Sequence, residues 1–296
     1  MKAVLVEPQQ RLVLADTPDP APGPGQAAVE VEAIGVGYFD IMNLRNGATS
    51  VPGVEVVGRV RDGRRVLALV LSGGYAEQVV ADADQLYPVP ENLDPADAVA
   101  LGVNAMVAES AVHRAGVAPG ERVLVRGASG GIGVLATQIS HARGAEVTAV
   151  TSSAEYGERL RTLGAAKIVD RTRERPEETY DVIIDTAAGP QVREHLELLR
   201  PNGRYVLCGG TAGVPEPEAF EPLMRDFHKS PTLSAFSLTS VSPEDRRKSW
   251  DRVLELVEDG QLAAVRDQTF PLAGAAAALQ HVEQGKSFGK VVLLNG

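Results

Sequence analysis

A glycine cluster at residues 127–133 limits what this chain can fold into more than any other feature. The cluster follows a short apolar run at residues 123–125 and precedes a segment, residues 134–143, with apolar residues at helical spacing. A second apolar run follows at residues 146–150. The order of strand, glycine turn, helix and strand predicts a βαβ unit.

The spacing of these glycines suits a turn that binds the pyrophosphate of a dinucleotide. Glycine lets the backbone turn sharply, approach a phosphate closely and pack a helix tightly on its strand. Free N–H groups and the helix dipole then face the anion. A flexible loop without a ligand is the alternative, and the flanking strand and helix argue against it. The expected cofactor contacts are Ala128, Ser129, Gly130, Gly131, Ile132 and Gly133.

The end of the second strand carries hydroxyl groups where NAD-binding proteins carry an acidic residue. A carboxylate there would bind the ribose 2′-hydroxyl and repel a 2′-phosphate. Thr151, Ser152 and Ser153 occupy this place, and Tyr156 and Arg159 follow shortly after. These side chains favour NADPH over NADH as the cofactor. Ser153 is also suited to cap a helix that begins at the next residue, and the two roles are compatible.

Composition and charge favour a globular protein that acts on small molecules. The chain has 296 residues, 44% of them hydrophobic, which is enough for two domains with apolar cores. Its net charge of −10 and the lack of clustered Lys and Arg argue against nucleic acid or anionic membranes as partners. The single cysteine, Cys208, excludes an internal disulfide and fits a reducing compartment. Apolar runs are too short for a secretory signal or a membrane span, so we expect a cytoplasmic location.

The pattern of the chain changes near residue 94. Before it, short runs separated by Pro and Gly predict antiparallel β structure, whereas Asp94 and Pro95 are suited to begin a helix that extends to Ala115. From Glu121 onward, strands alternate with helices, which predicts a parallel, doubly wound sheet. The charged residues 171–179 are expected to form a solvated loop or short helix. The expected strands are 123–125, 147–150, 167–169, 181–185, 203–208 and 231–238, and further helices are expected at 243–258 and 271–284.

Several motifs, taken in order, resemble the medium-chain dehydrogenase/reductase superfamily, in particular its zinc-independent quinone oxidoreductase and enoyl reductase branch. These motifs are residues 35–40, 52–55, 73–77, 127–133, 163–165, 199–204 and 289–292. The resemblance implies an α/β protein with a Rossmann doubly wound parallel sheet and a discontinuous GroES-like β-barrel catalytic domain. The catalytic domain would comprise residues 1–97 plus 243–296, and the Rossmann domain residues 98–242. The last strand would return to the first domain.

The resemblance also implies further contacts and an assembly. Asn104 stands where a threonine commonly lies against the nicotinamide amide group, and an asparagine can donate or accept a hydrogen bond there. An interior helix asparagine is the alternative. Gly209 is added to the expected cofactor contacts. A homodimer would form when the strand near residues 233–238 pairs across a two-fold axis.

The resemblance allows the zinc-ligand positions of the family to be compared one by one with this sequence. Zinc-dependent relatives hold the catalytic metal with a cysteine and a histidine in the first two motifs. Gly37 and Val54 occupy these places here, and neither has a side chain that binds metal. No zinc-dependent alcohol dehydrogenation is expected. The histidines show no ligand spacing; they are His113, His141, His195, His228 and His281.

Without zinc, the hydride acceptor must be activated by conjugation, as quinones and α,β-unsaturated carbonyls are. The family commonly places an asparagine and a tyrosine near the nicotinamide, and Gly37 and Met42 stand there instead. Tyr38 and Asn43 are the remaining polar candidates for the catalytic site. Either Tyr38 or water would supply the proton, and a packed aromatic of the β domain is the alternative for Tyr38. Asp40 is expected to be a structural hydrogen-bonding residue.

The sequence thus leaves two functions of different classes open. The first is an NADPH-dependent, zinc-independent reductase that transfers hydride to a small quinone or enone. The second is a non-redox member of the same fold, either a cyclase or an NADPH-sensing binding protein, which the missing asparagine and tyrosine motivate. The segments 58–66 and 67–72 are shorter than is usual in the family, so a more open substrate cleft is expected.

Overall fold

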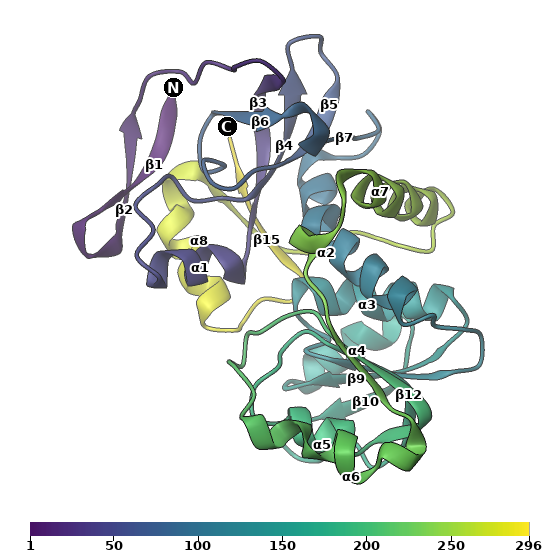
Figure 1. The fold of residues 1–296 in the computed structure, drawn as a ribbon. Helices are drawn as coiled ribbons and strands as arrows, with labels where there is room; N and C mark the ends of the chain where they lie inside the picture. The colour runs from purple at the N-terminus through teal and green to yellow at the C-terminus, as the bar shows by residue number, and fades with distance from the viewer. Residues whose placement is uncertain (296) are drawn as a thin grey trace. The chain divides into compact units, whose positions relative to one another are not determined.

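The computed structural model describes residues 1–295 (Figure 1), which divide into two units. Unit 1 comprises Met1–Val103 together with residues 264–295, and unit 2 comprises Asn104–Ala263. The division falls inside helix α2 (Pro95–Arg114), next to Gly102, whose φ of 29° and ψ of −133° are not helical. Among the described residues, no helix is long and apolar enough to cross a membrane.

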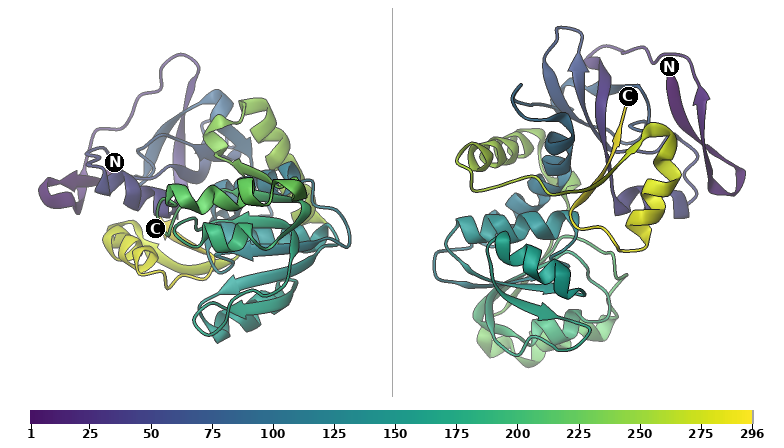
Figure 2. Two further views of the ribbon diagram at one scale, coloured as in Figure 1. Left: turned by 60° about the horizontal axis from the view of Figure 1, so that its bottom comes forward. Right: turned by 180° about the vertical axis from the view of Figure 1, so that it is seen from behind.

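Unit 2 is built on a parallel sheet that has six strands within residues 1–295, and Figure 2 shows it from two further sides. The strand order β10-β9-β8-β11-β12-β13 is that of the Rossmann fold, with the first strand beside the second and the fourth. This order confirms the predicted doubly wound sheet. The strands are β8 (Arg122–Arg126), β9 (Glu146–Thr151), β10 (Ala165–Asp170), β11 (Tyr180–Asp185), β12 (Leu199–Leu207) and β13 (Thr232–Ala235).

Helices follow the strands of unit 2 as the alternation predicts, except between β10 and β11. Residues 171–179 contain turns and no helix. Helix α7 groups with unit 2, whereas the sequence analysis placed residues 243–263 in the first domain. The buried Glu109 of α2 accepts hydrogen bonds from Ser249 and Arg252 of α7, which accounts for the difference. The helices are α3 (Gly131–Ala142), α4 (Ala154–Thr162), α5 (Val192–Leu196), α6 (Glu221–Arg225) and α7 (Pro243–Glu258).

Unit 1 is mainly antiparallel β structure. Its larger sheet has the order β14-β15-β3-β4-β5-β7, with β6 also paired to β3, while β1 and β2 form a separate hairpin. Strand β15 lies antiparallel to β3, so the last strand returns to the first part of the chain as expected. The strands are β1 (Lys2–Glu7), β2 (Arg11–Asp16), β3 (Gln26–Val36), β4 (Glu55–Val60), β5 (Arg65–Leu69), β6 (Gln78–Asp82), β7 (Leu86–Pro88), β14 (Arg266–Pro271) and β15 (Lys290–Leu294).

Two helices, α1 (Tyr38–Arg45) and α8 (Ala275–Glu283), lie side by side in unit 1 (Figure 1). Both contribute to the apolar core of the unit, α1 through Ile41 and α8 through Leu279. Alternate residues of β3, such as Val29 and Val31, reach the same core, as the two-residue period of a half-buried strand requires. Helix α1 is thereby fixed against the sheet.

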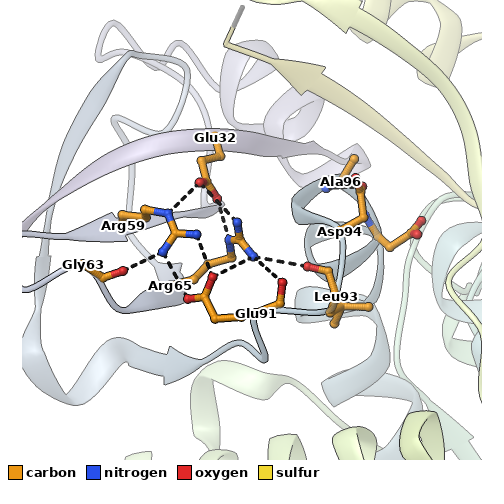
Figure 3. A network of polar contacts seen from close by, with 9 residues as sticks. Glu32, Arg59, Gly63, Arg65, Glu91, Leu93, Asp94 and Ala96 are labelled. Carbon is orange, nitrogen blue, oxygen red and sulfur yellow. Dashed lines mark hydrogen bonds and ion pairs between the residues drawn. The ribbon is translucent and has the colours of Figure 1, made fainter.

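A network of ion pairs holds the segment that leads into α2 (Figure 3). Arg59 of β4 and Arg65 of β5 both pair with Glu32 of β3, and Arg59 also pairs with Glu91. Arg65 further donates to the backbone carbonyls of Glu91 and Leu93. The side chains of Arg65 and Glu32 are 11% and 29% exposed, so this one pair is shielded from solvent more than an ordinary surface pair, whereas Glu91 is 64% exposed.

Helix α2 then begins as the sequence predicts. Asp94 caps it, because its Oδ1 accepts the backbone N–H of Ala96 at 3.0 Å and that of Asp97 at 3.2 Å. Gly102 interrupts it with a positive φ, which glycine adopts without steric cost. Asp94 therefore fixes where α2 begins, and Gly102 fixes where its helical geometry breaks.

Candidate functional site

The glycine turn connects β8 to α3 at the carboxyl edge of the parallel sheet. Helix α3 begins at Gly131 after the N-cap Gly130, and within residues 1–295 no side chain caps it. Its first N–H groups are therefore available to an anion. A Cβ at Gly133 would lie 2.2 Å from the carbonyl oxygen of Gly127, so only glycine permits this packing of helix on turn. Both features fit the pyrophosphate of a dinucleotide.

The remaining expected cofactor contacts lie partly in this turn and partly in other elements of the chain. Ala128 is buried beneath the turn, whereas Ser129 and Ile132 are half-buried at its surface. Gly209 follows β12, and a Cβ there would lie 2.1 Å from the carbonyl oxygen of Thr186, so the ends of β11 and β12 approach closely. Asn104 is half-buried in α2, shortly after the break at Gly102.

The hydroxyl-bearing end of β9 is close to the start of α4. Thr151 is buried, and its Oγ1 has no hydrogen-bond partner within the described part of the chain. The Oγ of Ser153 accepts the backbone N–H of Tyr156 at 3.4 Å, so Ser153 caps α4, which is one of its two expected roles. Ser152 and Arg159 are exposed. The exposed polar groups at this strand end fit a phosphate.

Arg171 joins this group of residues, although the sequence analysis assigned it to a solvated loop. Strand β10 is parallel to β9 with Asp170 opposite Thr151, and the N–H of Arg171 donates to the carbonyl of Thr151 at 2.9 Å. Its side chain is exposed. Parallel strands end at one edge of a sheet, so the position of Arg171 two residues after the predicted strand 167–169 was the available signal.

A buried polar network supports the sheet behind the glycine turn. Arg126, directly before the turn, donates to Asp185 Oδ2 at 2.9 Å, and the hydroxyl of Tyr205 donates to the same oxygen at 2.5 Å. Burial, together with the charge of Asp185, raises the pKa of the Tyr205 hydroxyl. The same two causes raise the pKa of the Cys208 thiol to about 12, so the thiol remains protonated. The network keeps these strand ends in place.

In unit 1, a cavity of about 40 Å³ lies beside α1. Its lining includes Asp40 and Asn43 of α1, Val54, and the exposed residues Leu71 and Ser72. The structure therefore brings one of the two candidate catalytic residues, Asn43, to a cavity that reaches the surface.

Tyr38, the other candidate catalytic residue, is not among the residues that line this cavity. Its half-buried ring packs against the core of unit 1. Arg45 donates to its hydroxyl at 3.4 Å and also pairs with Glu283 at 2.6 Å. This is the packed position that was the alternative for Tyr38.

Asp40 makes the structural hydrogen bonds expected of it. It is 1% exposed, and its Oδ2 accepts the N–H of Gly37 at 2.9 Å and the hydroxyl of Tyr75 at 3.1 Å. Burial raises the pKa of its carboxyl group from 3.8 to about 6, against the opposing effects of these hydrogen bonds and of Lys290. Its second oxygen, Oδ1, is buried and has no partner within residues 1–295.

A buried ion pair between Glu55 and Lys290 lies next to Asp40. The side chains are 2% and 5% exposed, and Glu55 also accepts the backbone N–H of Val103 at 2.8 Å. A Cβ at Gly37 would lie 3.6 Å from the Lys290 ammonium. A positive charge therefore lies close to the position at which zinc-dependent relatives carry a cysteine ligand. In the described part of the chain, no three His, Cys, Asp or Glu side chains are grouped to hold a metal ion.

Comparisons with known proteins agree with this architecture. Residues 163–293 match a family model described as zinc-binding dehydrogenase. The chain is 32% identical to the quinone oxidoreductase of Sus scrofa, over 82% of this chain and 79% of that protein. It is 34% identical to polyketide synthase GfsB of Streptomyces halstedii over 81% of this chain, and 34% identical to PikAII of Streptomyces venezuelae over 82%. The chain spans only 4% and 6% of the lengths of these two synthases.

Solved structures extend the comparison to nearly the full chain. The quinone oxidoreductase of Thermus thermophilus, solved alone and with NADPH, is 33% identical with a TM-score of 0.84, covering 99% of this chain and 100% of that one. A 2-haloacrylate reductase is 25% identical with a TM-score of 0.86, covering 99% of both chains. From its identity to quinone oxidoreductases over most of their length, the chain belongs to the quinone oxidoreductase branch of the medium-chain dehydrogenase/reductase superfamily.

Proposed function

We propose that the protein is an NADPH-dependent reductase that transfers hydride to a quinone or an α,β-unsaturated carbonyl without a catalytic zinc. The observation that carries this proposal is the uncapped start of α3 at Gly131, packed on the turn through Gly133. When bound, NADPH supplies the hydride. The Thermus thermophilus relative, solved with NADPH, supports this choice of cofactor.

The residues of unit 2 would bind and orient the cofactor. The N–H groups at the start of α3 would bind the pyrophosphate, and the groups around Thr151 and Arg171 would bind the 2′-phosphate. Asn104 and Gly209 would complete the contacts on the nicotinamide side. In this proposal residues 104–263 form the dinucleotide-binding domain, and unit 1 supplies the substrate-binding side chains.

The proposed class of hydride acceptor follows from the side chains of unit 1. Neither Gly37 nor Val54 can hold a metal that would polarise a simple carbonyl. A conjugated acceptor avoids this need, because charge moves along the conjugated system onto its oxygen as hydride arrives. Phe39 and Met42 expose 53% and 42% of their surface on α1, which suits a flat apolar acceptor. The porcine quinone oxidoreductase and the 2-haloacrylate reductase support these two acceptor classes.

The loss of reduced-nicotinamide absorbance tests this function. Purified protein would receive NADPH, or NADH in parallel, with an ortho-quinone or an enone as acceptor. We expect turnover with NADPH well above that with NADH. Cofactor binding without turnover across both acceptor classes would contradict the reductase and favour a cyclase or an NADPH-sensing protein.

Replacing Arg171 tests the cofactor preference. Arg171→Ala should raise the KM for NADPH about 10- to 100-fold, because a charge-assisted hydrogen bond to phosphate contributes about 1.5 to 3 kcal/mol. The KM for NADH should not change. Arg173→Ala is the matched control, since Arg173 is also exposed and pairs with Asp170 instead. Equal effects of the two substitutions on NADPH would contradict a specific role for Arg171.

Replacing Gly130 separates cofactor binding from folding. A Cβ there has room, its nearest neighbour being the Gly127 carbonyl oxygen at 3.4 Å, and Gly130 is the N-cap of α3. Gly130→Asp should therefore fold at least as stably as the wild type, because aspartate caps helices well. Its charge should nevertheless abolish NADPH binding, as measured by calorimetry. Gly130→Ala, which adds no charge, should keep much of the affinity; tight NADPH binding by the aspartate variant would argue against a phosphate site.

We also propose a homodimer through β13. Within residues 1–295 this strand pairs with β12 alone, so its other edge leaves backbone N–H and C=O groups unpaired. A second copy would satisfy these groups and extend the sheet across a two-fold axis. Light scattering at micromolar concentration should report twice the chain mass, and a monomer would contradict the proposal.

A further inference from the structure

Strands β8 and β11 are neighbours at the centre of the sheet of unit 2. They flank the point at which the strand order β10-β9-β8-β11-β12-β13 changes direction along the chain. Open α/β sheets bind their ligands in the crevice outside this point, at the carboxyl ends of the strands. Arg126 lies opposite Asp185 in the parallel register, so the next residues, Gly127 and Thr186, are neighbours at that edge. The sequence analysis assigned no role to Thr186.

Thr186 is packed against a glycine on each side. Its surface is only 8% exposed. A Cβ at Gly127 would lie 2.4 Å from Thr186 Oγ1, and a Cβ at Gly209 would lie 2.1 Å from the Thr186 carbonyl oxygen. Both distances are shorter than any ordinary contact, so the two glycines leave the space that Thr186 fills. Thr186 therefore joins the glycine turn after β8 to the segment after β12.

The hydroxyl of Thr186 binds the backbone of the glycine turn. Its Oγ1 donates to the carbonyl oxygen of Arg126 at 2.9 Å, and the carbonyl oxygen of Gly127 lies 3.4 Å from the same Oγ1. The backbone N–H of Thr186 also donates to the Arg126 carbonyl, at 3.3 Å. One side chain thus holds two successive carbonyl groups of the turn toward β11.

The Gly127 carbonyl connects this contact to helix α3. It accepts the backbone N–H of Gly130, the N-cap of the helix, at 3.1 Å. A Cβ at Gly133, in the first turn of the helix, would lie 2.2 Å from the same oxygen. Protein interiors transmit small displacements because they are closely packed. A shift of the Gly127 carbonyl would therefore move the start of α3, where the N–H groups for the pyrophosphate are expected.

Thr186 is itself held in place by the residues around it. Asp185 Oδ1 accepts the backbone N–H groups of Ala187 at 2.8 Å and Ala188 at 3.0 Å. Arg126 donates to Asp185 Oδ2 at 2.9 Å and to the Ala188 carbonyl at 2.5 Å. Ala188 has a positive φ of 57°, a conformation that these contacts maintain. The segment after β11 is therefore fixed, and Thr186 gives the turn a rigid support.

We propose that Thr186 is a positioning residue of the dinucleotide site: its hydroxyl holds the Gly127 carbonyl, and through it the start of α3, in the geometry that binds the pyrophosphate. This inference rests on the proposed function, in which NADPH occupies the site. Thr186 acts through the backbone of the turn. Its effect should therefore fall on the pyrophosphate and spare the 2′-phosphate, which is expected at the end of β9.

Two substitutions at Thr186 separate the hydroxyl from the shape of the side chain. Thr186→Val puts a methyl group in place of Oγ1, 2.9 Å from the Arg126 carbonyl oxygen, whereas a carbon needs about 3.3 Å there. The carbonyl must shift. Thr186→Ser keeps the hydroxyl and should restore wild-type behaviour. Thr148→Val is the matched control, because Thr148 is also buried, at 3% exposure, but lies within β9 away from the turn.

The dissociation constants of two ligands test the proposal. NADPH carries both the pyrophosphate and the 2′-phosphate, whereas adenosine 2′-monophosphate carries only the latter. Thr186→Val should weaken NADPH binding about 10-fold, the effect of losing one buried hydrogen bond, and leave adenosine 2′-monophosphate binding unchanged. Thr186→Ser and Thr148→Val should bind both ligands as the wild type does. Equal weakening of both ligands by Thr186→Val would indicate a general structural role and overturn the proposal.

The turn can also be observed without any ligand. NMR of the unliganded protein should show faster hydrogen exchange at the amide of Gly130 in Thr186→Val, because its acceptor, the Gly127 carbonyl, is displaced. The amide resonances of residues 127–133 should shift in the same variant. Neither change is expected in Thr186→Ser or Thr148→Val. Identical spectra and exchange rates in Thr186→Val and the wild type would contradict the proposal.

The two kinds of measurement distinguish this inference from the proposed function. If the wild type binds NADPH and Thr186→Val binds it equally well, the cofactor site stands and Thr186 does not position it. If the wild type does not bind NADPH, the proposed function fails, and the exchange rate of Gly130 still decides whether Thr186 holds the turn.

Discussion

The buried ion pair between Glu55 and Lys290 is the interaction on which much of unit 1 depends. Glycine lies on both sides of the carboxylate: a Cβ at Gly35 would come 2.6 Å from one oxygen, and a Cβ at Gly102 would come 2.4 Å from the other. The absence of side chains at Gly35 and Gly102 thus leaves space for the buried carboxylate of Glu55. Removal of Lys290 would leave that charge uncompensated, which typically costs about 3 to 5 kcal/mol.

The same pair organises its surroundings in two directions. Glu55 accepts the N–H of Val103 at the break in α2, so the backbone at this break is held by a carboxylate from β4. Lys290 brings its charge from β15 to the vicinity of Gly37 and Asp40, where zinc-dependent relatives would carry a metal. The ammonium group at this position pairs with Glu55 and repels another cation.

The sequence predicted those structural features that depend only on neighbouring residues. The βαβ order, the cap by Asp94 and the cap by Ser153 each depend on a few neighbouring residues, and all three are present. The grouping of α7 with unit 2 has no local signature, because it depends on hydrogen bonds of Ser249 and Arg252 to Glu109, about 140 positions earlier.

The candidate site likewise depends on contacts between residues that are far apart in the sequence. Asp40 meets Tyr75 across 35 positions and Glu55 meets Lys290 across 235, so neither environment has a local signature. Asp40 was expected to be structural, and nothing in its sequence neighbourhood reveals the unsatisfied oxygen. Arg171 was within reach of prediction, because the parallel register places the residue after β10 beside the end of β9. It was missed because a run of charges is more often simply solvated.

The burial of Cys208 has a consequence for the chemical durability of the protein. The acceptors of the proposed reaction, quinones and enones, are electrophiles that alkylate thiolates, so an enzyme that reduces them is exposed to inactivation by its own substrates. Here the single cysteine of the chain is buried, with a pKa raised to about 12 and its thiol donating to the Asp185 carbonyl. The thiolate that would react is almost absent at neutral pH. The only thiol of the chain is therefore protected from alkylation.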